Sequence, residues 1–147
     1  MSNSLAALAI AQRGVFTRQQ ALQHYSPGQV RARLSNGCWV RVFHGVYRRS
    51  DTMADARLRT IAAGLSMRQP VVACWHTAAE LHGFSVVDAQ HTHIVATVGR
   101  RQRQRLIVHS AELTRHDVCS YTGVPATTAE RTATDLARGL SRPDGLA

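Results

Sequence analysis

The sequence of 147 residues contains no lysine, so all 18 of its basic residues are arginine. A Walker A phosphate loop requires a lysine, and Schiff-base catalysis uses a lysine amine. Nuclease sites that place a lysine beside paired carboxylates are excluded for the same reason. The chain therefore lacks the chemistry of several large enzyme classes.

Cysteine is scarce as well. The three cysteines, Cys38, Cys74 and Cys119, are odd in number and form no CxxC pair, so neither a disulfide framework nor a zinc ribbon is supported. The apolar run at residues 5–11 has no basic n-region and is far too short to span a bilayer. We expect a cytoplasmic protein that does not bind membranes and whose cysteines are reduced and packed.

Acidic residues are also few. There are only nine, which leaves a formal net charge of +9 and an isoelectric point near 11.1. A charge of this size favours a polyanionic partner, of which nucleic acid is the commonest. The length is sufficient for one domain or two small ones, each with a core of its own.

Two helix-start signals lie close together in the first third of the chain. Thr17 and Gln20 have the spacing of a capping box, in which a hydroxyl and an amide satisfy free N–H groups at a helix start. Ser26 and Gln29 repeat that spacing, with Pro27 at the first helical position. The few residues between them leave room only for a tight turn. This order predicts a helix-turn-helix.

The second of these helices, expected over residues 27–36, has two distinct faces when its residues are placed about 100° apart. Val30 and Leu34 form the buried face. Arg31 and Arg33 flank the opposite face and are placed to reach phosphates, while the residues between them sample base edges in a major groove. These central residues are small or carry an amide: Gly28, Gln29, Ala32 and Ser35.

Residues 39–49 combine β-branched and aromatic side chains with a central His-Gly pair, which predicts a β-hairpin, the wing of a winged helix. Its arginines are placed to follow a phosphate backbone or enter a minor groove. Two alternatives stay open: a small helical motif with merely solvated arginines, and a protein-docking module. The residues predicted to contact DNA are Thr17, Arg18, Ser26, Gly28, Gln29, Arg31, Ala32, Arg33, Ser35, Arg41, His44, Arg48 and Arg49.

The fold class expected from this order is α+β. A winged helix-turn-helix over residues 1–50 is followed by a small α/β domain over residues 51–147. A polar break at residues 50–52 is expected to cap the first helix of the second domain. Its expected elements are a helix at 53–67, a strand at 71–75, a helix from a capping box at Thr77 and Glu80, strands at 93–98, 106–109 and 117–121, and a closing helix from a capping box at Thr127 and Glu130.

The loop between the strands at 93–98 and 106–109 is dense in guanidinium groups. It carries Arg100, Arg101, Arg103 and Arg105. This loop is either a second phosphate contact or the solvated tip of a hairpin, because runs of charge at exposed turns are common without a ligand.

Histidine and cysteine supply the only candidate metal ligands with suggestive spacing. His91 and His93 share one side of an extended segment, and Cys74, His76 and His82 offer further ligand atoms. No CxxC, HExxH or nucleophile-elbow pattern accompanies them. We therefore interpret these residues as packed or exposed, and predict no metal site, no cofactor and no catalytic residue.

Four segments, at residues 14–21, 39–47, 76–83 and 125–137, occur in an order that resembles the AbiEi-type antitoxins and their actinobacterial relatives. The resemblance covers nearly the whole chain. It implies an N-terminal winged helix-turn-helix that binds promoter DNA and a following α/β domain, in a type IV toxin–antitoxin pair whose toxin is a nucleotidyltransferase. Many relatives continue into a further domain, sometimes similar to very-short-patch-repair endonucleases, so the chain is either a fragment or a naturally short member.

The leading hypothesis is a non-enzymatic repressor that binds double-stranded DNA at its own promoter, as an AbiEi-like antitoxin. One alternative is an antitoxin module that acts by binding a toxin protein. Another is the N-terminal part of a larger endonuclease-like protein. A homodimer is considered because many helix-turn-helix proteins bind paired half-sites.

Overall fold

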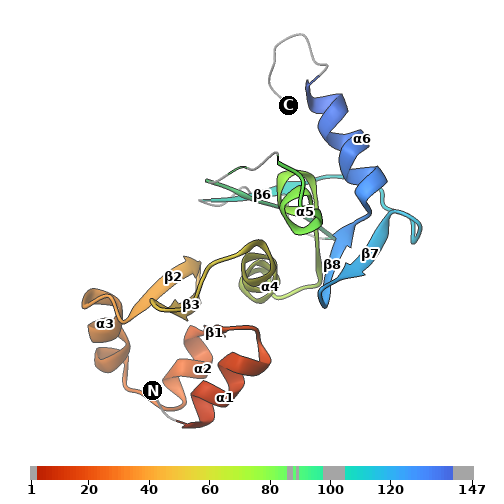
Figure 1. The fold of residues 1–147 in the computed structure, drawn as a ribbon. Helices are drawn as coiled ribbons and strands as arrows, with labels where there is room; N and C mark the ends of the chain where they lie inside the picture. The colour runs from red at the N-terminus through yellow and green to blue at the C-terminus, as the bar shows by residue number, and fades with distance from the viewer. Residues whose placement is uncertain (1–2, 86–87, 89, 98–104, 141–147) are drawn as a thin grey trace. The chain divides into compact units, whose positions relative to one another are not determined.

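The computed structural model describes residues 3–85, 88, 90–97 and 105–140 (Figure 1). The chain divides into two compact units, unit 1 at Met1–Arg68 and unit 2 at Gln69–Ala147. Each unit combines helices with its own β-sheet, which confirms the predicted α+β class. Within the described residues, no helix is long and apolar enough to cross a membrane.

Unit 1 is a winged helix-turn-helix extended by one helix (Figure 1). Its three strands form a small antiparallel sheet in the order β1-β3-β2, where β2 and β3 are the predicted wing. The elements are α1 (Asn3–Ala11), β1 (Val15–Thr17), α2 (Arg18–Leu22), α3 (Pro27–Ser35), β2 (Trp39–Phe43), β3 (Val46–Arg49) and α4 (Ala56–Met67).

Both predicted capping boxes of the helix-turn-helix are confirmed. The backbone N–H of Gln20 donates to Thr17 Oγ1 at 3.1 Å, and the Thr17 N–H donates to Gln20 Oε1 at 2.8 Å. Ser26 and Gln29 make the same reciprocal pair at the start of α3. These bonds fix where α2 and α3 begin, and hence the length of the turn between them.

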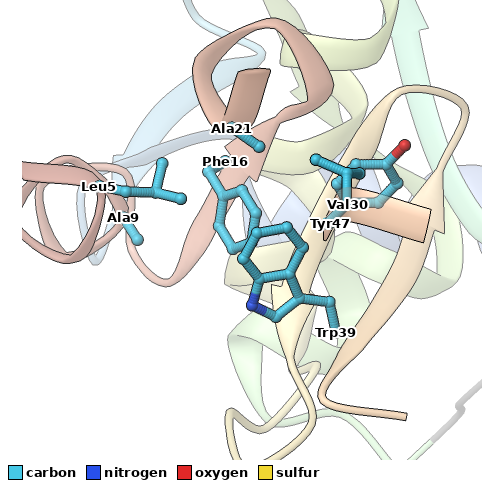
Figure 2. Close-up of a cluster of buried hydrophobic side chains, with 7 residues drawn as sticks. All are labelled: Leu5, Ala9, Phe16, Ala21, Val30, Trp39 and Tyr47. Atoms are coloured by element: carbon cyan, nitrogen blue, oxygen red, sulfur yellow. The ribbon is translucent and has the colours of Figure 1, made fainter. Parts of the chain in front are cut away.

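The core of unit 1 is built around aromatic rings (Figure 2). Phe16 is completely buried, and its ring meets the ring of Trp39 edge-on with centroids 4.9 Å apart. Tyr47 contacts both rings, and Tyr25 packs on Trp39 from the turn that follows α2. These contacts join β1 to the wing. The buried cluster consists of Leu5, Ala9, Phe16, Ala21, Val30, Trp39 and Tyr47.

Helix α4 belongs to unit 1, which moves the boundary from the predicted residue 50 to Arg68. The helix packs against β1, β2 and β3, so its apolar stripe completes the core of this unit rather than starting a second one. Its N-cap is Asp55, whose side chain accepts from the N–H of Leu58 at 2.8 Å. The predicted start at residue 53, capped from residues 50–52, is therefore wrong.

Unit 2 carries a five-stranded mixed sheet in the order β6-β5-β4-β8-β7. β4 pairs with β5 antiparallel and with β8 parallel, and α5 packs on β5, on β8 and against α6. The elements are β4 (Val71–Ala73), α5 (Trp75–His82), β5 (Thr92–Ala96), β6 (Leu106–His109), β7 (Val118–Tyr121), β8 (Val124–Thr127) and α6 (Ala129–Leu140).

The helix starts predicted in unit 2 need correction. α5 begins at Trp75, directly after β4, so Thr77 lies inside the helix and does not cap it. Thr77 Oγ1 instead accepts from the backbone N–H of His93 at 2.7 Å, which fastens α5 to β5. At α6 the capping hydroxyl belongs to Thr128, which accepts from the N–H of Arg131, whereas Thr127 Oγ1 lies 2.6 Å from Thr132 Oγ1.

The strand arrangement of unit 2 also departs from expectation. β5 and β6 are parallel neighbours, with Thr92 opposite Leu106, whereas the two strands of a hairpin would pair antiparallel. β8 was not anticipated. It lies between β4 and β7 and brings Thr127 to the start of α6.

Candidate nucleic-acid interface

Helix α3 presents one face to the core and the other to solvent. Val30 is 1% exposed and belongs to the aromatic cluster, while Leu34 is half-buried against it. The opposite side matches the face predicted to read bases. Its exposed residues are Gly28, Gln29, Arg31, Ala32 and Ser35.

The side chain of Gln29 is already committed within α3. Its Oε1 accepts from the N–H of Ser26 at 2.8 Å as one half of the capping box. A glutamine that reads adenine uses its amide oxygen and its amide N–H₂ together. Bidentate reading by Gln29 would therefore require the capping bond to open.

The two arginines of α3 differ in their surroundings. The Arg33 guanidinium lies 4.1 Å from the Tyr25 ring centroid and 5.5 Å from that of Trp39, in cation–π contact with both. Arg31 is exposed and makes no hydrogen bond or ion pair with any residue that the structure describes. Arg31 is thus available to a partner, whereas Arg33 also contributes to the packing of the turn before α3.

The wing is fastened to the rest of unit 1 at its tip. Gly45 adopts a φ of +72°, as its place in the hairpin turn requires. Its carbonyl accepts from the N–H of Arg18 at 2.8 Å, and the His44 carbonyl accepts from Ser66 Oγ of α4 at 2.8 Å. The exposed side chains of Arg18, Arg41 and His44 are therefore carried by a braced backbone.

The last two arginines of the wing are engaged internally. Arg48 Nη1 donates to the carbonyls of Arg49 and Thr52, at 3.1 and 2.8 Å, and so fixes the turn that leaves β3. Arg49 Nη2 forms an exposed ion pair with Asp51 Oδ2 at 2.8 Å. Both residues were predicted to contact DNA, and in the structure each has an intramolecular role that a phosphate would have to displace or share.

Of the arginine-rich loop of unit 2, Arg100, Arg101 and Arg103 lie outside the described residues. Arg105 is exposed and has a φ of +67° immediately before β6. Its phosphate contact stays a prediction.

The structure brings together some of the candidate metal ligands and separates others. His76, in the first turn of α5, and His93, in β5, approach Asp88, with one ligand atom of each lying within 4.8 Å of the others. Cys74 is buried, and burial raises the pKa of its thiol. His82 Nε2 is 2.7 Å from the carbonyl of Thr127 and thereby links α5 to β8. Asp88 was missed from the sequence because it follows no motif.

Two more histidines complete this cluster. His93 Nδ1 lies 2.8 Å from His109 Nε2, and His91 Nδ1 lies 3.1 Å from Asp88 Oδ2. Burial, and then the positive charges of neighbouring histidines, lower the pKa of His109 to about 4, and burial also lowers the pKa of His93. Burial opposes ionisation of Asp88, but hydrogen bonds led by that from His93 hold its pKa below the ordinary value. The carboxylate is therefore charged near neutral pH.

Comparison with known proteins covers both units. Residues 3–50 match the family model described as "Transcriptional regulator, AbiEi antitoxin", and residues 71–147 match the model described as "AbiEi antitoxin C-terminal domain". The first match spans the helix-turn-helix and wing without α4. The second covers more than half of the chain and includes every described strand of the mixed sheet.

Two curated relatives, both uncharacterised proteins of Mycobacterium tuberculosis from two strains, are 35% identical to the chain over 120 residues. That region makes up 81% of this chain and 43% of each relative, so the chain spans less than half the length of the proteins it matches. The two family models nevertheless follow each other here in the order that the resemblance implied. The chain belongs to the AbiEi antitoxin family of transcriptional regulators.

Proposed function

We propose that the chain is a repressor that binds double-stranded DNA at its own promoter through α3 and the wing. The observation that carries this proposal is the exposed face of α3, which sits on a rigid aromatic core beside a braced, arginine-bearing hairpin. A helix of this kind enters the major groove, and the wing lies against the neighbouring backbone. The net charge of +9 supplies attraction that does not depend on sequence.

The proposed contacts divide by chemistry. Arg31 is the strongest candidate for a base or phosphate contact on α3, because its guanidinium has no partner among the described residues. Ala32 and Ser35 allow close approach to base edges. Arg18 and Arg41 are proposed to hold phosphates on the two sides of the groove.

The test is a fluorescence-anisotropy titration of the chain with its own upstream DNA and with a shuffled duplex, at several salt concentrations. Specific repression predicts that the native duplex binds about a thousandfold more tightly near physiological salt. Equal binding of both duplexes, with a steep dependence on salt, would mean that the positively charged chain makes only nonspecific contacts with phosphates. No binding to either duplex would reject the proposal.

A pair of arginine variants locates the interface. Arg31→Ala is expected to weaken binding to the native duplex by about 10-fold to 100-fold, the usual effect of losing one good base contact. Arg115→Ala is the matched control, because it removes the same charge from an exposed position in unit 2. Arg33 is a poor choice for this purpose, since its removal also takes packing from Tyr25 and Trp39.

The match of residues 71–147 to an antitoxin domain supports a second role for unit 2, opposing a toxin. The family resemblance implies that this toxin is a nucleotidyltransferase. This role is separable from DNA binding. Co-expression with the product of the neighbouring gene should show that Arg31→Ala still relieves toxicity although its binding to the operator is weakened. Loss of both activities in a folded Arg31→Ala protein would mean that the toxin acts through the same surface as DNA.

A further inference from the structure

The half-buried cluster of unit 2 has no part in the proposed DNA interface, and its arrangement of ligand atoms suits a metal ion. We propose that His76, Asp88 and His93 bind one divalent transition-metal ion of the zinc type. The three residues come from the first turn of α5, the connection after it and β5. An ion held by all three would fasten the start of α5 to the central part of the sheet.

The positions of the ligand atoms fit one ion. Around tetrahedral Zn²⁺, with bonds of about 2.0–2.2 Å, neighbouring ligand atoms lie roughly 3.3–3.6 Å apart. In the structure the three atoms lie within 4.8 Å of one another, and His93 Nε2 is 2.9 Å from Asp88 Oδ2. On binding an ion, the His93–Asp88 pair would widen by a few tenths of an ångström, and any pair near the 4.8 Å limit would shorten.

One atom of the cluster has an unmet requirement. His76 Nδ1 is buried and has no hydrogen-bond partner among the residues that the structure describes. Buried ring nitrogens are normally satisfied, because an unpaired polar atom costs free energy. Coordination through Nδ1 would satisfy this atom, which the hydrogen bonds within the cluster leave unpaired.

The surrounding residues support the ligands in the way that metal sites require. A coordinating histidine usually gives its second ring nitrogen to a hydrogen-bond partner, which fixes its tautomer and orientation. His93 has this arrangement, with Nε2 directed at Asp88 and Nδ1 at His109 Nε2, 2.8 Å away. The carboxylate ligand, Asp88, is oriented by His91, whose Nδ1 contacts both of its oxygens at 3.1–3.3 Å.

The backbone next to His76 is strained. Trp75 has a φ of +49°, a left-handed conformation that is unusual for a bulky residue, and its ring stacks on His109 with centroids 5.1 Å apart. Such conformations persist where the surroundings enforce them. Trp75 is the first residue of α5, separated from β4 only by Cys74, and the residue after it is the candidate ligand His76.

The donor set selects the class of ion. Two imidazole nitrogens and one carboxylate oxygen suit Zn²⁺ and its first-row neighbours, whereas Mg²⁺ and Ca²⁺ prefer oxygen ligands throughout. Three protein ligands leave one position for water. The alternative is a metal-free network in which the histidines simply bond to Asp88, and that network makes the opposite prediction about metal affinity.

The experiment titrates the untagged chain of 147 residues with Zn²⁺ by calorimetry, after chelator treatment and dialysis into metal-free buffer. We expect one equivalent to bind with micromolar or tighter affinity. Co²⁺ should give the intense visible absorption of a four- or five-coordinate ion. A weak, octahedral-type Co²⁺ spectrum, or no saturable Zn²⁺ binding, would overturn the proposal.

Variants distinguish the built site from adventitious binding by surface histidines. His76→Gln and Asp88→Asn keep the size of each side chain and should weaken Zn²⁺ binding at least tenfold. His24→Gln and His116→Gln are matched controls at exposed positions and should bind like the parent. Equal affinity in all five proteins would reject the site. If His76→Gln does not fold, Asp88→Asn and the Co²⁺ spectrum of the parent still decide the question.

Discussion

The two units of this chain direct their polar side chains in opposite ways. Unit 1 fills its interior with aromatic rings and leaves Arg31 and Arg41 exposed. Unit 2 gathers His76, His93 and the carboxylate of Asp88 into a half-buried cluster. Charges that point outward suit a large polyanion, whereas converging ligand atoms suit a small cation. The direction of the side chains, more than their number, separates a recognition surface from an ion site.

The largest effect is expected from Phe16→Ala, which removes the ring at the centre of unit 1. Phe16 is 0% exposed and contacts Trp39 and Tyr47, so the variant should lose about 3–5 kcal/mol of stability. Ile10→Ala, at a position 77% exposed, should change stability by only about 0.5 kcal/mol or less. Urea denaturation measures the difference between the two variants.

The same variant tests whether the two units are separate. Amide hydrogen exchange followed by mass spectrometry should show faster exchange in β1 and β3 of the Phe16→Ala protein and unchanged protection in β4 and β5. Equal loss of protection in both sheets would contradict the division into two separate units, because it would mean that they unfold together in one cooperative transition.

A smaller loss is expected from Gly14→Ala, where α1 turns into β1. Gly14 has a φ of +105°, and a Cβ there would lie 2.8 Å from Thr52 Cγ2. Left-handed strain and overpacking together should cost roughly 2–4 kcal/mol. Gly37→Ala is the control, because its φ of +82° adds strain without a clash and should cost only about 1–2 kcal/mol. Similar losses of stability in the two variants would show that the Thr52 side chain moves aside at little cost in free energy.

In unit 2 the corresponding test is Thr77→Val, which preserves shape and removes the hydroxyl. Thr77 is 2% exposed and accepts the N–H of His93, so the variant leaves a buried donor unpaired and should lose about 1–3 kcal/mol. Thr134→Val removes an exposed hydroxyl from α6 and should have little effect. An unaffected Thr77→Val protein would show that β5 does not depend on this bond to α5.

Sequence reasoning predicted unit 1 well because its signals are local. Ser26, Pro27 and Gln29 lie within four positions, and α3 begins where that spacing predicts. The same reasoning failed at Thr77, whose spacing to Glu80 also fits a capping box. There the tertiary bond from the His93 N–H uses the hydroxyl, and the helix begins at Trp75, three residues before the start that a Thr77 cap would give.

The histidine cluster was beyond sequence reasoning for a different reason. Its members are distributed over α5, β5, β6 and the connection that carries Asp88, and only the parallel pairing of β5 with β6 places His109 beside His93. The alternation of His91 and His93 was visible, but nothing in the sequence showed that His76 Nδ1 would be buried without a partner. Pairing between distant strands is the information that spacing does not contain.

The smallest effects are expected at Gln29, and they test whether this residue belongs to the DNA-contacting face of α3. Because its Oε1 caps Ser26, we expect Gln29→Ala to lose about 0.5–1.5 kcal/mol of stability and Ser26→Ala a similar amount. If Gln29 only caps α3, both variants should weaken specific DNA binding by similar factors, smaller than the loss in Arg31→Ala. A loss of tenfold or more confined to Gln29→Ala would show that the capping bond opens in the complex and that this amide reads a base. Two measurements on both variants distinguish these outcomes. Anisotropy titrations with the native duplex give the DNA affinity, and the midpoints of urea denaturation give the stability.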